Sequence, residues 1–198
     1  MPKVSDEHRE KQRERILDAA LSCVARKGFA STSMADIIAE AGLSAGAVYL
    51  YYRSKDQLTV DVGRRVLSKK IAVLDGFLAL DEVPSPAVAI PEFLAQMPRD
   101  GFFPDVAVQV WGEAVHSPEL TDTARNLIGE VSGHFAAYFA AWFGQSRGLG
   151  EKEALREGAR VAPAAVGLVQ GYMVQSVFLD EAARQRYRDA AGAVLMGL

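Results

Sequence analysis

Cysteine is almost absent from this chain, which carries Cys23 alone among 198 residues. A single thiol excludes an internal disulfide framework and a zinc site built from several cysteines. Cys23 falls among apolar residues of the first predicted helix, beside Ala20 and Val24. This setting predicts a buried, unreactive thiol rather than a redox sensor.

Long apolar stretches are missing too, and no segment is apolar enough to span a bilayer. The N-terminal residues MPKVSDEHREKQRER are charged and contain no signal-peptide core. The chain also has no nucleophile elbow and no phosphate-binding glycine loop. We therefore expect a cytoplasmic protein that is not an enzyme, needs no cofactor and does not enter the membrane.

Histidine is scarce, with three in the chain. Glu113 and His116 are three residues apart, as in the carboxylate–histidine pairs of di-iron helix bundles. Those bundles need a second pair at the same spacing and two further glutamates, whereas Glu130 and His134 are four residues apart. A metal-dependent helix-bundle enzyme is therefore the weakest alternative, and we expect no metal site.

Charge is unevenly distributed along an otherwise ordinary composition, with 49% hydrophobic and 24% charged residues. The net charge is −3, but residues 1–55 hold nine Lys/Arg against seven Asp/Glu. The remainder holds 13 Lys/Arg against 18 Asp/Glu. This asymmetry has the sign that DNA binding requires, although a solvated helix face explains the charged N-terminus equally well.

Residues 33–58, SMADIIAEAGLSAGAVYLYYRSKDQL, carry the clearest signal. Ser33 and Asp36 form a capping-box-like start of one short helix, and Gly42 supplies the turn that follows it. Ser44 then caps a second short helix. Two short helices joined by a tight glycine turn predict a helix-turn-helix whose second helix enters the DNA major groove.

The outward face of that second helix is poor in hydrogen-bonding side chains. Val48 and Tyr52 define its buried side, and Gly46 on the outward side leaves the backbone free to approach DNA. Ala45 and Ala47 have the chemistry to pack on thymine methyl groups. We therefore expect few direct hydrogen bonds between this helix and the bases. This keeps open a second interpretation, a helical small-molecule-binding or interaction protein without specific DNA binding.

The rest of the chain is predicted to be helical, with no convincing alternating strand. Ser54 and Gln57 form a capping box that starts a long helix. Proline and glycine place breaks at residues 81–86 and 98–101, and a glycine-rich loop at residues 144–150. The nine expected helices cover residues 5–27, 33–41, 45–51, 54–80, 86–97, 104–116, 117–143, 151–179 and 181–195.

A run of residues at fixed spacing, within residues 12–60, resembles the DNA-binding segment of the TetR family of bacterial transcriptional regulators. Ile16–Ala20 and Lys27–Phe29 resemble the family's first helix and its exit. Ser33 stands where the family usually has Thr, and Tyr52 where it usually has Phe. The other matching residues are Asp36, Ile37, Ala41, Gly42, Leu43, Ser44, Gly46, Tyr49, Ser54, Lys55 and Leu58.

The resemblance implies an all-α protein with an N-terminal three-helix helix-turn-helix DNA-binding domain, residues 1–53. A C-terminal six-helix regulatory domain, residues 54–198, would bind a ligand and form the dimer. Tyr49 and Lys55 are implied to contact DNA phosphates. With the neighbours that the two short helices place beside them, the expected DNA-binding residues are Ser33, Met34, Ser44, Ala45, Gly46, Ala47, Tyr49, Tyr51 and Lys55.

Aromatic residues and methionines recur on the helices expected after residue 86. Each taken alone is best explained as core, because buried aromatics dominate the cores of helical domains. The resemblance implies that some of them line a pocket for an unknown small-molecule effector of flat or hydrophobic character. The expected ligand-binding residues are Phe93, Met97, Phe103, Trp111, His116, Phe135, Tyr138, Trp142 and Tyr172.

The last two predicted helices carry a stripe of small and apolar residues. A four-helix interface with a second copy would remove this surface from water, and a two-fold dimer matches a palindromic operator. The expected interface residues are Gly158, Ala162, Val166, Val169, Tyr187, Ala191 and Val194. The favoured interpretation is a homodimeric, ligand-responsive regulator of transcription, a repressor, with double-stranded DNA and an effector as its partners.

Overall fold

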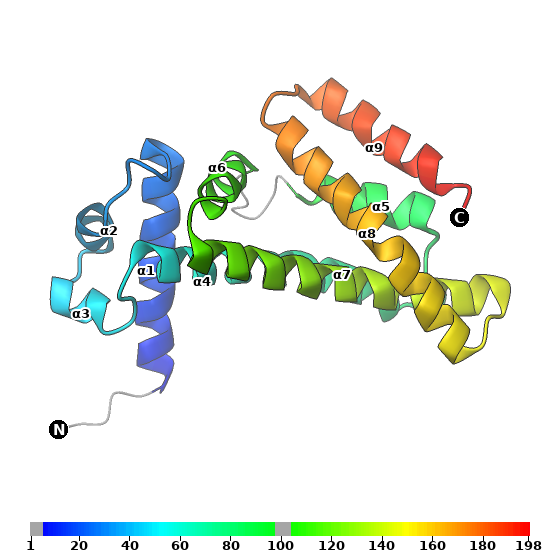
Figure 1. The fold of residues 1–198 in the computed structure, drawn as a ribbon, viewed down its shortest axis with the longest axis horizontal. Coiled ribbons are helices and arrows are strands. Elements are labelled where there is room, and N and C mark those ends of the chain that lie inside the picture. The colour runs from blue at the N-terminus through cyan, green and yellow to red at the C-terminus, as the bar shows by residue number, and fades with distance from the viewer. Residues whose placement is uncertain (1–5, 98–103) are drawn as a thin grey trace. The chain divides into compact units, whose positions relative to one another are not determined.

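A computed structural model describes residues 6–97 and 104–198, apart from the side chains of residues 66, 67, 69 and 119. Within these ranges the chain forms nine helices and no strand, which confirms the all-α prediction (Figure 1). The helices divide into two compact units, Met1–Arg65 with Asp105–Thr123, and Val66–Pro104 with Ala124–Leu198. We call them the head and the body.

The head is built on an N-terminal helix, α1, against which two short helices pack. Its helices are α1 (Asp6–Lys27), α2 (Met34–Ala41), α3 (Ala45–Tyr49), the first part of α4 (Lys55–Leu78) and α6 (Pro104–Ala114). The apolar faces of α1, α2, α3 and α4 meet in one core made of Ile16, Leu17, Ala19, Ala20, Cys23, Ile37, Ala41, Val48, Tyr52 and Leu58. The expected burial of the Cys23 thiol is confirmed, and this burial raises its pKa above the ordinary value.

Helix α6 belongs to the head although it follows α5 in the sequence. The side-chain oxygen Oε1 of Gln109 accepts a hydrogen bond from the backbone N–H of Phe29, at 2.7 Å. Ser117, which follows α6, donates from its hydroxyl to the carboxylate of Asp56, at 3.1 Å. The compact head therefore extends beyond the expected three-helix domain of residues 1–53, and that functional boundary stays a prediction.

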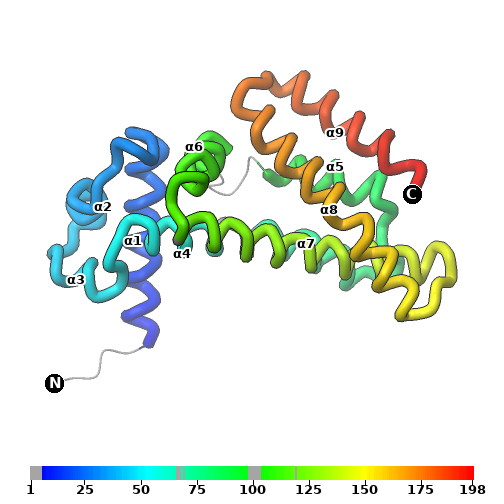
Figure 2. Tube along the Cα trace, in the orientation of Figure 1, coloured from blue at the N-terminus to red at the C-terminus, as the bar shows by residue number. Residues whose placement is uncertain are grey.

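The body contains the remaining helical segments. They are the rest of α4, α5 (Pro86–Ala95), most of α7 (Pro118–Arg147), α8 (Glu151–Ser176) and α9 (Glu181–Leu195). Aromatic side chains fill its centre. The rings of Phe93 and Phe135 pack edge to face with their centroids 5.5 Å apart, and those of Tyr138 and Phe139 with their centroids 5.3 Å apart. The 30 residues of α7 form one helix that can be followed in Figure 2.

Helices α8 and α9 pack closely because small residues lie between them and their neighbours. A side chain at Gly158 would collide with the backbone of Ala136 and Ala140 on α7. A side chain at Gly192 would meet the carbonyl of Ala87 on α5 at 2.9 Å. The small-residue stripe therefore serves packing within the chain.

The predicted boundary after the seventh helix is wrong by four residues. Helix α7 continues through Gly144 to Arg147, so the glycine-rich loop shrinks to residues 148–150. Gly148 adopts a left-handed conformation, φ 65°, which ends the helix. In the described part of the chain, no helix combines the length and apolar character needed to cross a membrane.

Candidate nucleic-acid interface

The turn between α2 and α3 is fixed by hydrogen bonds that the sequence encodes locally. The hydroxyl of Ser33 accepts from the backbone N–H of Asp36, and the Asp36 carboxylate accepts from the backbone N–H of Ser33, at 3.2 and 2.9 Å. Gly42 closes α2 at φ 59°, in the left-handed region that favours glycine. Ser44 then caps α3 by accepting from the N–H of Ala47. The predicted helix-turn-helix is thus confirmed at each junction.

A half-buried polar contact ties Tyr52, three residues after the end of α3, to α1 and α4. Val48 and Tyr52 are buried, as predicted. The Tyr52 hydroxyl accepts from Nε of Arg13 at 3.2 Å and donates to the carboxylate of Asp61 at 3.1 Å. Burial raises the pKa of Tyr52 to about 12, so the phenol remains a proton donor at neutral pH. This triad sets the direction in which α3 presents its free face.

The residues predicted to contact DNA divide into an exposed group and a supporting group. Ser33, Ser44, Ala45, Gly46 and Tyr49 are exposed on α2, α3 and the turn. The other four predicted residues are half-buried, and two of them, Met34 and Tyr51, pack against the head core. The two serine hydroxyls serve as helix caps. The predicted set therefore forms one surface, but part of it supports that surface from within.

Lys55 has a partner inside the head. Its ammonium donates to the carbonyl oxygen of Phe29 at 2.9 Å and lies 4.2 Å from the centre of the Phe29 ring. An ammonium carries three N–H donors, so this contact leaves two for a phosphate. The predicted phosphate contact of Lys55 stays a prediction, now alongside a structural role at the turn between α1 and α2.

Two exposed side chains next to α3 are not among the residues predicted to contact DNA. Arg53 is exposed and forms no ion pair with any residue that the structure describes. Leu50, directly after α3, is 86% exposed. The only sequence signal for either residue was its position beside the recognition helix, because a lone arginine or leucine is ordinary on a protein surface.

Many other cations of the head are neutralised locally. Lys27 pairs with Asp36 at 2.6 Å, and Arg26 pairs with Glu40 at 2.8 Å. Arg65 contacts Glu14 and Asp18 on α1, both at 2.6 Å. These three basic residues of the head therefore hold helices to one another.

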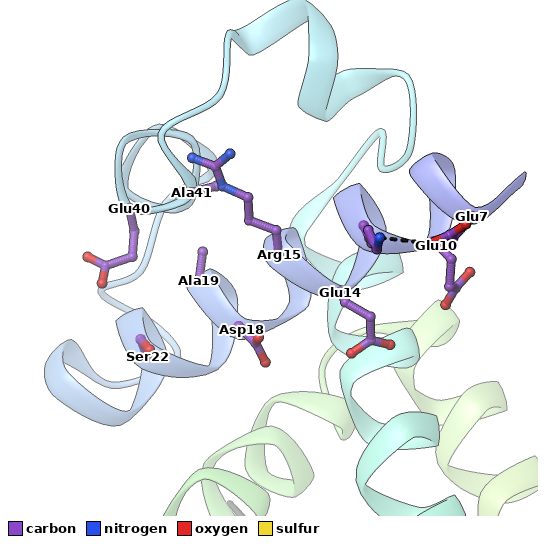
Figure 3. A pocket seen from close by; sticks show the side chains of 10 residues that line it. Glu7, Glu10, Glu14, Arg15, Asp18, Ala19, Ser22, Glu40 and Ala41 are labelled. Atoms are coloured by element: carbon purple, nitrogen blue, oxygen red, sulfur yellow. Dashed lines mark hydrogen bonds and ion pairs between the residues drawn. The ribbon is translucent and has the colours of Figure 1, made fainter. Parts of the chain in front are cut away.

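The head also has a surface groove of about 610 Å³ along α1, on the side where α2 ends (Figure 3). Its lining includes five carboxylates, from Glu7, Glu10, Glu14, Asp18 and Glu40, with two cations, Lys11 and Arg15. Carboxylates repel the phosphates of DNA. The excess of carboxylates in this groove is unfavourable for DNA binding.

The predicted ligand-binding residues are dispersed between the two units. Trp111 and His116 belong to the head and are exposed. The body members Phe93, Met97, Phe135, Tyr138 and Tyr172 are buried, Trp142 is half-buried, and Phe103 lies outside the described residues. The buried phenols have partners: Tyr138 donates to the carbonyl of Pro84, and Tyr172 accepts from Arg188. In this structure the buried aromatics of the body are core, and the role of the predicted set in binding a ligand stays a prediction.

The predicted dimer residues are also mostly internal to one chain. Gly158, Ala162, Val166, Val169 and Ala191 are buried within the body. Tyr187 is half-buried and donates to the carbonyl of Leu168, which ties α9 to α8. Val194 alone of this set is highly exposed, at 70%. Helices α8 and α9 each carry small and apolar residues on two faces. The sequence did not reveal which of these faces is buried in the body and which is exposed.

Glu113 and His116, the pair weighed as a metal site, both lie at the C-terminal end of α6 or directly after it. Among the side chains that the structure describes, no three of His, Cys, Asp or Glu come together in a way that would hold a metal ion.

The chain is similar to known regulators in both sequence and fold. The family of bacterial regulatory proteins, tetR family, matches residues 16–62. An uncharacterized HTH-type transcriptional regulator of Bacillus subtilis, YfiR, is 41% identical over 75 residues, or 34% of this chain. The chain spans little more than a third of that relative's length, 37%.

Solved structures extend the likeness to the whole fold. Salmonella enterica GusR is 24% identical with a TM-score of 0.72, covering 99% of this chain and 98% of GusR. A regulator from Saccharomonospora viridis in complex with choline is 20% identical with a TM-score of 0.69, covering 94% of this chain and 96% of that protein. The matching proteins are regulators of transcription, not enzymes. With its capped α2–turn–α3 segment inside the matched residues, the DNA-binding segment of this chain is similar to that of the TetR family of bacterial regulatory proteins.

Proposed function

We propose that this chain is a cytoplasmic repressor that binds a palindromic DNA operator as a homodimer and leaves it when a small molecule binds the body. The proposal rests on one observation, that the head holds α3 in a fixed position with its outer face exposed. Two caps, a left-handed glycine and the Arg13–Tyr52–Asp61 triad fix this helix, yet its outer face remains exposed. Repression is the simplest outcome, because a dimer on a promoter blocks polymerase without needing a further contact surface.

The dimer is proposed to form through the outward faces of α8 and α9. Val174 on α8 is 44% exposed and Val194 on α9 is 70% exposed. Pro163 and Gly167 continue the exposed stripe along α8, and Ala190 extends it on α9. Apolar side chains at this density are unfavourable in water and favour a helical interface between two copies. The proposed interface thus keeps the expected helices but uses their opposite sides.

The effector is proposed to be a small hydrophobic or aromatic molecule bound within the body. The aromatic content of the body supports this chemistry, and the Saccharomonospora viridis relative, which holds choline, supports a small-molecule effector in general. Aromatic faces attract quaternary ammonium groups such as the one in choline. A ligand that binds the DNA-incompetent conformer a hundredfold more tightly weakens operator binding by the same factor, about 2.7 kcal/mol.

The effector signal is proposed to reach the DNA-binding segment through α4 and α6. Helix α4 is continuous from Lys55 in the head to Leu78 in the body. Helix α6 contacts the turn before α2 through Gln109 and Phe29. A shift of either helix changes the position of α2 and α3, and the operator's helical repeat fixes the spacing of the two recognition helices.

Selection of bound sequences from random duplex DNA tests the proposal. A repressor dimer of this kind enriches a palindrome, and the purified protein then binds that operator with a steep dependence on salt. Recovery of no enriched sequence would instead support a helical small-molecule-binding protein that retains the fold. Adding choline or flat aromatic compounds to the operator complex then tests release directly.

A further inference from the structure

The exposed surface of α3 has an unusual chemical composition for a DNA reader. From Ala45 to Tyr52 the sequence is AGAVYLYY, with no Arg, Lys, Asn, Gln, Asp or Glu. The two serine hydroxyls nearby, Ser33 and Ser44, are already engaged as caps. The side chains that usually hydrogen-bond guanine or adenine are therefore missing from the recognition helix.

Leu50 dominates the apolar part of this surface. Its backbone N–H bonds to the carbonyl of Gly46 at 3.2 Å, so the two residues lie one helical turn apart on the same side of the helix. Ala47 precedes Leu50 by three residues and borders the same face. Leu50 is 86% exposed, whereas Val48 beside it is completely buried. A leucine held this far out of the core is available to a partner.

Gly46 supports the same conclusion independently. A glycine inside a helix is about 1 kcal/mol less favourable than alanine. Nothing within the chain requires glycine here, because a Cβ built at Gly46 has no neighbour within 4 Å. Its φ does not lie in the left-handed region either. The missing side chain leaves the backbone of α3 open to a surface that approaches from outside.

We propose that this face reads thymine: Leu50 packs against the C5 methyl groups of thymines in the major groove, and Gly46 lets the helix approach closely enough for that contact. The inference rests on the proposed function, since it presumes an operator. Thymine is the base whose major-groove edge carries a methyl group, and an apolar side chain distinguishes it without hydrogen bonds. The operator half-site then carries thymine at the positions that face Leu50.

Replacing single thymines by deoxyuridine tests the contact, because uracil keeps the base pair and lacks only the methyl group. Burial of one methyl group corresponds to roughly a fourfold change in affinity. On an operator obtained by selection, we expect losses of this size at one or two thymines in each half-site and none elsewhere. In the variant L50A, the same replacements should have no further effect.

Two other variants separate this contact from folding. L80A removes an exposed leucine of the body. It should bind the thymine operator and its deoxyuridine versions with the same affinities as the unaltered protein. G46A should raise or preserve thermal stability, because alanine favours a helix, while it weakens operator binding. A G46A protein that binds the operator normally would overturn the close approach assigned to Gly46.

The outcomes distinguish this inference from the proposed function. If the protein binds its operator and no deoxyuridine replacement matters, the thymine assignment is wrong and the repressor proposal stands. If L50A weakens binding but remains equally sensitive to deoxyuridine, Leu50 does not contact the methyl groups and the inference fails. If no sequence is enriched, the proposed function itself fails first.

Discussion

The segment at residues 33–58 and the helix pair α8–α9 both carry amphipathic sequence patterns, yet only the first could be interpreted in detail. In the first segment, helices are so short that each cap, turn and buried residue has one possible place. In the pair α8–α9, small and apolar residues occur on two sides of each long helix. Short capped helices therefore encode orientation locally, whereas long helices leave it to tertiary packing.

The largest expected effect probes the inward side of α8. Ala162 is completely buried in the body. An unpaired carboxylate at such a site costs about 3–5 kcal/mol, so A162E should lose most of its helical circular dichroism at 37 °C or melt far below the unaltered protein. If A162E stays folded and becomes monomeric, Ala162 faces a second chain and the assignment of sides is reversed.

The second effect concerns the outward side of the same helix. V174E places a charge at a position that is 44% exposed, so the monomer should fold normally. Like charges from two copies should split the dimer, and operator affinity should fall about a hundredfold or more because two half-sites are no longer held together. Sedimentation of V174E as a stable dimer would move the interface away from this face.

The two regions also show what sequence can supply. The caps at Ser33 and Ser44, the turn at Gly42 and the burial of Cys23 follow from neighbours a few residues away, and each is confirmed. The Gln109–Phe29 contact joins residues 80 positions apart, and no local pattern announces it. The sequence also could not predict the contact of Lys55 with Phe29, because a lysine at the start of a helix is equally well placed to bind a phosphate.

A third prediction compares the two cations at the start of α4. R53A removes an exposed guanidinium that forms no ion pair with the residues that the structure describes. It should lower operator affinity and reduce the slope of log affinity against log salt concentration by about one. K55A should have the same effect on the salt slope and also lower the thermal midpoint, because the Phe29 contacts are lost. Titration of each variant at several salt concentrations, with a melting curve, separates the roles. An unchanged salt slope in K55A would confine Lys55 to structure.

A fourth, smaller effect concerns the hydroxyl of Tyr52. Y52F removes the group that bridges Arg13 and Asp61 but leaves their direct contact of 2.7 Å intact. We expect a loss of about 1 kcal/mol in unfolding free energy, the usual contribution of one hydrogen bond. Y49F, which alters an exposed phenol, should not change stability and serves as the control. Equal melting temperatures for Y52F and the unaltered protein would show that the bridge adds nothing to the Arg13–Asp61 pair.

The smallest effect is the pH dependence of the α2 cap. The ammonium of Lys27 and the hydrogen bonds from Ser33 hold the pKa of Asp36 well below its ordinary value of 3.8. A carboxyl group whose pKa is lower in the folded state stabilises the fold above its unfolded pKa, and that stabilisation is lost as pH falls. D36N should therefore melt slightly below the unaltered protein at pH 7, and the difference should shrink steadily as the pH is lowered from 5 towards 2. Melting curves across that range are the measurement, with D81N, which alters an exposed carboxyl group outside the helices, as the control. A difference that stays constant down to pH 2 would mean that the charge of Asp36 does not matter, and that the capping geometry alone holds the first helix of the motif.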